Sequence, residues 1–139
     1  MIRVVLDGAP VGKGRPRFVR STGRVYTPGK TVTYEGALAL AGQQAMRGQQ
    51  PLRGPITVHA TAYMPIPMSW PRRKILAALE GSLRPGRPDA DNLLKVLDAL
   101  NGVVWHDDAQ IAEARISKLY DPDPRLEVEV YPLGWSERQ

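Results

Sequence analysis

The sequence predicts one domain of the α/β or α+β class, in which helices pack on a mixed, mostly antiparallel sheet. Segments with strand-like apolar patterns alternate with Ala- and Leu-rich segments of helical character along the 139 residues. A chain of this length buries about two-thirds of the surface that its unfolded form exposes. Because no internal repeat or low-complexity tract divides it, the domain is expected to span 1–139.

The first half of the chain is expected to contain four strands, two of them in a hairpin, and one long helix. A short apolar strand at 2–6 is followed by a glycine-rich basic loop and by a basic hairpin at 18–26 that turns at S-T-G. The Ala-rich segment 31–47 predicts a helix that ends at the following glycine. Apolar and polar residues alternate at 56–64, which is typical of a half-buried strand.

The second half is expected to contain two short helices and two strands. The run at 72–81 predicts a helix that ends at its glycine, and the basic loop 82–88 leads to a second helix capped by Asp89 and stopped by an Asn-Gly pair. Two strands are expected at 111–119 and 126–131. The linker D-P-D-P-R joins them most simply as an antiparallel pair.

Charge is distributed unevenly along the chain. Residues 1–88 contain 14 Lys and Arg against 3 acids, whereas 89–139 contain 5 against 11, although the net charge is only +5. The first part is therefore expected to attract a polyanion such as nucleic acid. The alternative is that the basic balance serves solubility alone.

Several classes of protein are excluded by composition. The chain has no cysteine, which rules out disulfides, thiolate catalysis and cysteine-bound zinc, and its two histidines leave little for a histidine-based zinc site. No apolar run approaches the roughly 20 residues needed to cross a bilayer, and the beginning MIRVVLDGAP lacks the pattern of a secretion signal. We expect a soluble cytoplasmic protein that makes no membrane contact.

The most informative segment is RPDADNLLKVLDALNGVVWHDD, from Arg87 to Asp108, which holds five aspartates and one lysine. Asp89 and Asp91 flank a helix start, and the pair Asp107-Asp108 follows a glycine-containing turn. Clustered carboxylates repel each other, and Mg²⁺ or Mn²⁺, which prefer oxygen ligands, would relieve that repulsion. A short return segment of Val103, Val104 and Trp105 is expected to bring the pair back beside the helix start.

Helical geometry places the charged residues of this segment on one side. At about 100° per residue, Asp91, Lys95 and Asp98 share a sector of roughly 60°, opposite the leucines and valine of the same helix. The plain structural alternative is that Asp89 is only a helix cap and that Asp91 with Lys95 is only a solvated ion pair, worth a few tenths of a kcal/mol. That alternative leaves the second acidic pair unexplained. His106 lies beside the pair, and we interpret it as a residue that takes no part in a hard-cation site.

The basic loop GAPVGKGRPR does not match a phosphate-binding P-loop, because three residues instead of four precede its Gly-Lys pair and no Ser or Thr follows. A better interpretation is a glycine-hinged loop in which Lys13, Arg15 and Arg17 contact DNA phosphates. A merely solvated basic loop explains this segment equally well when it is taken alone.

Together these residues resemble a known family. PDADNLLKVLDALNG followed by DDAQI is similar to the signature of RusA-type Holliday junction resolvases, and GKGRPRF with YTP is similar to the N-terminal pattern of one branch of that family. The resemblance implies a homodimeric, Mg²⁺-dependent endodeoxyribonuclease that cuts four-way DNA junctions by paired symmetric nicks. It also implies that Asp89, Asp91, Asp108 and Lys95 are the essential residues. Asp98 and Asp107 match further acidic positions, and Asp107 is a candidate metal ligand.

The chemistry of phosphodiester hydrolysis agrees with that implication, since carboxylate-held Mg²⁺ can activate water and stabilise the leaving oxygen. Lys95 would neutralise the scissile phosphate or orient the attacking water. Two other functions remain open at this point. One is a non-catalytic DNA-binding protein whose acidic cluster is structural, and the other is a metal-dependent nuclease for flaps, RNA or other nucleic acids.

Overall fold

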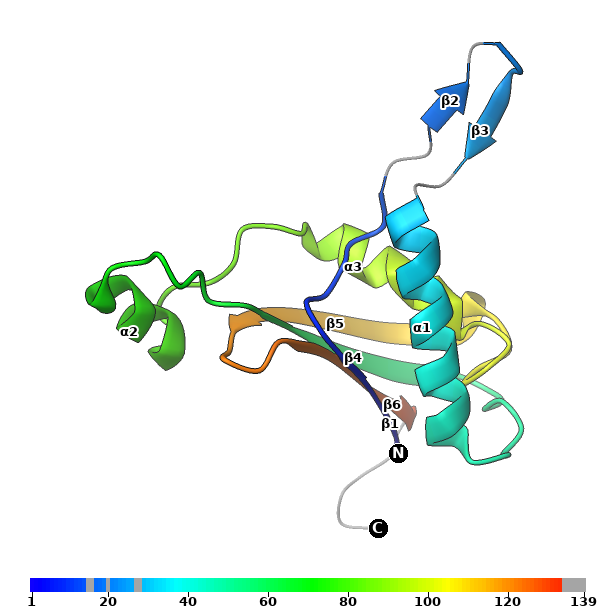
Figure 1. Ribbon diagram of the computed structural model, residues 1–139. Coiled ribbons are helices and arrows are strands. Elements are labelled where there is room, and N and C mark those ends of the chain that lie inside the picture. Colours follow the sequence, from blue (N-terminus) through cyan, green and yellow to red (C-terminus); the bar gives the residue numbers. More distant parts are fainter. Residues whose placement is uncertain (15–16, 20, 27–28, 134–139) are drawn as a thin grey trace.

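A four-stranded sheet with helices on one face forms the body of the molecule (Figure 1). The structure, a computed structural model, describes residues 1–14, 17–19, 21–26 and 29–133. The strand order is β1-β6-β4-β5. The bounds of these strands are Ile2–Asp7 for β1, Ile56–Met64 for β4, Ile111–Tyr120 for β5 and Arg125–Pro132 for β6.

Two of the three strand pairs are antiparallel, which confirms the predicted mixed, mostly antiparallel sheet of an α+β fold. β6 runs antiparallel to both β1 and β4, whereas β5 runs parallel to β4. β4 and β6 are the interior strands, and the apolar residues of β4 from Ile56 to Ala62 are buried, whereas β5, at the edge, keeps most of its first half exposed. Charged side chains on such an edge protect a sheet against pairing with other chains.

The expected antiparallel pairing of 111–119 with 126–131 is wrong. Both strands form at these places, but β4 lies between β5 and β6. The turn between them crosses the end of β4, where the backbone N–H of Asp121 donates to the carbonyl of Met64 at 3.0 Å. Sequence proximity favoured the simple hairpin, whereas the strand with the apolar pattern at 56–64 takes an interior position between β5 and β6.

The helices form where sequence reasoning placed them. α1 is Gly29–Met46, α2 is Arg72–Glu80 and α3 is Ala90–Val96. α2 ends at Gly81, which has the left-handed φ of 85° that terminates helices. α3 continues directly into a 3₁₀ turn, η1 (Leu97–Leu100), so only the last turn of the expected 89–101 helix departs from α geometry.

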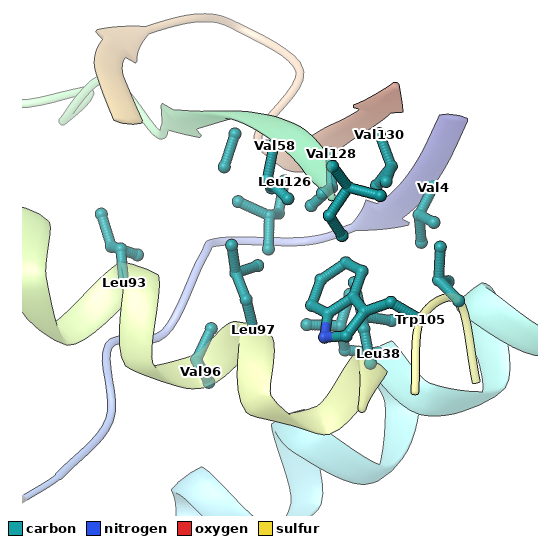
Figure 2. Close-up of a cluster of buried hydrophobic side chains, with 14 of the residues drawn as sticks. Val4, Leu38, Val58, Leu93, Val96, Leu97, Trp105, Leu126, Val128 and Val130 are labelled. Carbon is teal, nitrogen blue, oxygen red and sulfur yellow. The ribbon is translucent and has the colours of Figure 1, made fainter. Parts of the chain in front are cut away.

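The core lies between the sheet and the helices, as Figure 2 shows. Gly42 lets α1 approach closely, since a Cβ there would lie 2.7 Å from Cδ2 of Leu100. Trp105, in the segment after η1, is 1% exposed and contributes the largest buried side chain. The other labelled core residues come from the sheet (Val4, Val58, Leu126, Val128 and Val130), from α1 (Leu38) and from α3 and η1 (Leu93, Val96 and Leu97).

Two elements stand away from this body (Figure 1). The predicted hairpin is confirmed as β2 (Arg17–Val19) paired with β3 (Arg24–Tyr26), and it projects beyond the beginning of α1. α2 lies beyond the end of β4. Within the described part of the chain, no helix is long and apolar enough to cross a membrane.

Candidate active site

The start of α3 presents the first acidic residues to solvent. Asp89 is the N-cap residue by backbone conformation, but its side chain makes no capping hydrogen bond. The carboxylate of Asp89 therefore does not cap the helix through a hydrogen bond, although the plain structural alternative gives it that role. Asp91 and Lys95 are exposed, with 70% and 60% of their side chains accessible, and Lys95 Nζ lies 3.7 Å from Asp91 Oδ2. An ion pair this exposed contributes little to stability, so the pair remains available to a ligand.

The charged stripe of α3 and η1 has the orientation that the helical spacing predicts. Asp91, Lys95 and Asp98 all face outward. The apolar side of the same segment is fully buried and anchors the helix to the sheet, through Leu93, Val96, Leu97 and Leu100.

The N-terminal basic loop docks on this acidic segment. The backbone N–H of Lys13 donates to the carbonyl of Asn92 at 2.9 Å, and Lys13 Nζ lies 3.7 Å from Glu35 Oε2 and 3.8 Å from Asp98 Oδ2. A small cavity of about 210 Å³ remains between the loop and the helix start, bordered by Lys13, Pro88 and Asp89. The sequence did not indicate these acidic partners of Lys13, whose contact with DNA remains a prediction.

Two arginines beside Lys13, Arg15 and Arg17, are also predicted to bind DNA. Arg15 lies outside the described residues. Arg17 begins β2, so its backbone belongs to the projecting hairpin.

Gly12 makes the docking of this loop possible. A Cβ at this position would lie 2.8 Å from Cβ of Pro88 and 3.2 Å from Cβ of Asn92. Because a proline ring cannot rotate away, we expect Gly12→Ala to displace the loop and to destabilise the protein by about 1–3 kcal/mol, the usual cost of overpacking. Thermal unfolding measures this loss. Gly36→Ala, in an open position of α1, is the control and should keep or raise the melting temperature. Equal melting temperatures for the two variants would contradict the prediction.

Lys118, near the end of β5, holds the segment that leads into Asp89. Its Nζ donates to the carbonyls of Gly86 at 2.9 Å and of Pro88 at 3.3 Å, and the guanidinium of Arg84 donates to the carbonyl of Lys118 at 3.0 Å. These bonds fix the helix start to the far end of β5. No local pattern in the sequence could have indicated them, because Lys118 is 30 residues away from Pro88.

The second acidic group sits in the turn before β5, at the 3₁₀ helix η2 (Asp108–Gln110). The pKa of the Asp108 carboxyl is raised, first because it shares a hydrogen bond with the carboxyl of Asp107 and then because the charge of Asp107 repels its own. Asp98 adds to this repulsion, whereas the backbone N–H of Ala109 opposes it. The acidic turn therefore carries unrelieved negative charge, which a cation would neutralise.

Gln110 organises this turn and was missed in the sequence analysis. Its Oε1 accepts from the backbone N–H groups of His106 at 2.7 Å and Asp107 at 2.9 Å. Its Nε2 donates to the carbonyls of Leu52 and Gly54, each at 2.9 Å. The D-x-x-Q spacing of a capping box was the available signal for the bond from Asp107. The long-range pair has no local signal.

The two acidic groups, Asp89 with Asp91 and Asp107 with Asp108, lie near opposite ends of β5. The second pair therefore does not come back beside the helix start, as the sequence had predicted. Lys118 contacts the segment before Asp89, whereas Ile111 directly follows the acidic turn. Seven residues of extended strand separate these points, a distance on the order of 20 Å. Accordingly, no three acidic or histidine side chains in the described ranges gather closely enough to hold a metal ion. Trp105 fixes the return segment in the core, so the turn stays near the end of the helix.

The candidate ligands have the chemistry that Mg²⁺ prefers, but one chain does not bring all of them together at one site. All candidate ligands are hard carboxylate oxygens. The pKa of Asp108 is raised by its hydrogen bond with Asp107 and by the charge of Asp107, and a bound cation would favour the ionised form of both carboxyls. Mg²⁺ in nucleic-acid enzymes often binds through one or two carboxylates together with waters and substrate phosphate. Each acidic group, Asp89 with Asp91 or Asp107 with Asp108, could supply such a partial ligand set.

The raised pKa of the Asp108 carboxyl also predicts a stability change without metal. A raised pKa means that stability falls as the pH rises through that pKa. We therefore expect Asp108→Asn to raise the melting temperature in chelator at pH 7, and this gain to vanish near pH 3, where the carboxyl is protonated in either case. Asp123→Asn, in the turn after β5, is the charge-matched control. A lower melting temperature for Asp108→Asn at pH 7 would contradict this expectation.

Comparison with known proteins places this arrangement in a family. The sequence model described as "Endodeoxyribonuclease RusA" matches residues 7–131. The chain belongs to the RusA endodeoxyribonuclease family. The match includes the docked loop, both acidic groups, β4, β5 and all of β6 but its last residue, whereas of β1 it includes only Asp7. Membership in the RusA family identifies an endodeoxyribonuclease related to Holliday junction resolvases, whose substrate is branched DNA.

A relative in Bacillus subtilis (strain 168) is similar to this chain over nearly its whole length. The uncharacterized protein YqaN is 36% identical over 133 residues, which cover 91% of this chain and 93% of YqaN. The similarity therefore extends over nearly the whole of both proteins.

Proposed function

We propose that this RusA-family protein is a Mg²⁺-dependent homodimer that cuts four-way DNA junctions by paired symmetric nicks, with Mn²⁺ as an alternative ion. The observation that carries the proposal is the exposure of two separate acidic groups, Asp89 with Asp91 and Asp107 with Asp108, on a chain of this family. Hydrolysis of a phosphodiester by such a protein needs carboxylates to hold the ion and a nearby cation to neutralise phosphate.

The roles follow from where each side chain lies. Asp89, Asp91 and Asp108 are proposed to hold the metal, with Asp107 as a further ligand. The ion, when bound, supplies the Lewis acid that activates water and stabilises the leaving oxygen. Lys95 lies one helical turn from Asp91 and is exposed, so its ammonium group can neutralise the scissile phosphate or orient the attacking water.

The separation of the two acidic groups supports the homodimer. Within one chain, the two points of β5 that anchor them are on the order of 20 Å apart, and no three acidic or histidine side chains of the described residues gather closely enough to hold an ion. A two-fold axis can place the helix start of one protomer against the acidic turn of the other. The same symmetry then forms a second, equivalent site. Asp89 and Asp91 would then act with Asp108 of the partner subunit. Two equivalent sites suit a branched substrate of approximate two-fold symmetry.

The charge distribution supports DNA as the ligand. The basic first part of the chain forms the docked loop, the projecting hairpin and α2, which lie at the periphery of the body (Figure 1). Lys13, Arg15 and Arg17 are proposed to contact DNA phosphates from the loop and the hairpin. Contacts of this kind position a substrate without reading its sequence.

A comparison of substrates tests the proposal. The protein is incubated with a synthetic four-way junction, a linear duplex, a flap and an RNA of matched length, in Mg²⁺ and in chelator, and the nicks are mapped on each strand. We expect junction cutting in Mg²⁺ only, with nicks at symmetric positions in opposite strands. Faster cutting of the flap or RNA would assign a different nuclease activity. Salt-sensitive binding without cutting in any divalent metal would instead assign a non-catalytic DNA-binding role.

A further inference from the structure

A shallow groove borders the acidic turn on the side of the loop before β4. Its volume is about 420 Å³. One wall is the segment with Arg53 and Gly54, and the other is the segment from His106 to Gln110. We call this feature the Arg53 groove. It joins two parts of the chain that are more than fifty residues apart in sequence.

Gln110 locks the two walls of the Arg53 groove together. Its amide accepts two hydrogen bonds from the acidic turn and donates two, at 2.9 Å each, to the carbonyls of Leu52 and Gly54, on either side of Arg53. An amide side chain has two N–H donors and two acceptor lone pairs, so its capacity is filled. The backbone N–H of Leu52 also donates to the carbonyl of Val104 at 2.7 Å. Arg53 is therefore held at a fixed place beside the acidic turn.

Arg53 has a free positive charge in this position. It is exposed, and in the part of the chain that the structure describes it forms no ion pair, not even with Asp107 in the same groove. The lysines of the other candidate contacts differ, because Lys13 faces Glu35 and Asp98 and Lys95 faces Asp91. Arg53 can engage an external anion without first breaking an internal ion pair.

We propose that the Arg53 groove is a phosphate-binding subsite, in which Arg53 contacts a DNA backbone phosphate beside the acidic turn and Gln110 is the positioning residue that holds Arg53 there. The proposal rests on the proposed nuclease function and extends it to a residue outside the acidic motif. Asp107 and Asp108 repel a DNA strand unless positive charge lies next to them. A guanidinium group is suited to this task, because it binds phosphate through two parallel hydrogen bonds.

Binding measurements on Arg53→Gln test the first half of the proposal. Affinity for the four-way junction is measured in chelator over a range of salt concentrations, so that no cutting is required. We expect about tenfold weaker binding, the effect of losing one charge-assisted hydrogen-bonded contact, and a salt dependence reduced by about one phosphate contact. Arg53→Lys should restore the salt dependence but only part of the affinity, since lysine lacks the paired donors.

Arg3→Gln is the matched control, because it removes the same charge from β1, at the opposite edge of the sheet from β5. If Arg53→Gln and Arg3→Gln have the same affinity and salt dependence, the subsite is refuted. That result would leave the proposed function untouched, provided that the wild-type protein cuts junctions. Conversely, a wild-type protein that binds but never cuts would refute the nuclease proposal while the Arg53 measurement stayed interpretable.

The role of Gln110 is tested by coupling. Gln110→Met has a similar shape without the four hydrogen bonds and should weaken junction binding as Arg53→Gln does. The double variant should bind no more weakly than Arg53→Gln alone, because both changes remove one contact. Fully additive losses would remove Gln110 from the subsite. Gln110→Glu keeps both acceptor bonds and loses both donors, and it gives a second measurement should the methionine variant fold poorly.

Discussion

The Asp91→Asn protein is expected to bind a four-way junction at least as tightly as wild type and to cut it about 10²- to 10³-fold more slowly in Mg²⁺. The substitution removes a proposed metal ligand and one negative charge, and DNA is repelled less by the amide than by the carboxylate. Asp91 is exposed and its ion pair with Lys95 is solvated, so the fold should not change. Single-turnover cutting and a binding titration in chelator measure the two effects separately. Near-normal cutting by Asp91→Asn would remove this residue from the mechanism.

The same variant tests the composite site. If each site combines the helix start of one protomer with the acidic turn of the other, a heterodimer of Asp91→Asn and Asp108→Asn subunits contains one site with both changes and one with neither. We therefore expect the mixed, re-equilibrated proteins to regain nicking of one strand, although each protein alone is inactive. The matched mixture of Asp91→Asn with Asp89→Asn affects the same acidic group in both subunits and should stay inactive. Activity in the second mixture, or none in the first, would contradict the composite site.

Trp105→Ala is expected to destabilise the protein by about 3–5 kcal/mol, the usual cost of emptying a buried tryptophan site. Trp105 is 1% exposed, and its Nε1–H donates to the side chain of Asn101. The alanine variant leaves a cavity in place of the indole ring, and the side-chain amide of Asn101 loses its hydrogen-bond donor. A loss of this size is a large fraction of the 5–15 kcal/mol that holds most domains folded, so a partly unfolded protein is expected at physiological temperature.

Chemical denaturation measures this effect, with Trp70→Ala as the matched control. Trp70 packs edge-on against Tyr120 and under the ammonium of Lys74 at the base of α2, where it is only partly buried. Its loss should cost clearly less than that of Trp105. Equal losses for the two variants would mean that the return segment is not anchored through Trp105.

The sequence was sufficient for the helices and strands and for the outward orientation of the charged residues of α3, because these depend on local patterns. Alternation placed the strand at 56–64, and the 3.6-residue period placed Asp91 and Lys95 on the outer side of α3. Strand order could not be predicted in the same way. Which strand takes the centre of a sheet depends on burial on both sides, and the short linker after β5 favoured the wrong neighbour.

The geometry of the site depends on contacts that are distant in sequence. Gln110 reaches Leu52 over 58 residues, and Lys118 reaches Pro88 over 30. The short connection between Asp98 and Asp107 suggested that all the acids converge. The folded chain instead anchors the helix start and the acidic turn to opposite ends of one extended strand, a result that needs the tertiary structure.

The length of β5 consequently sets the distance between the two acidic groups of one chain. Deleting two residues from this strand would keep every remaining side chain on its own face, since strands repeat every two residues, yet it would shorten the interval by about 7 Å. Insertions in the turn after β5 leave the interval unchanged. Related sequences should therefore vary freely in length around 121–124 but keep the number of residues between the acidic turn and Lys118, because that number sets how far apart one subunit holds its two acidic groups.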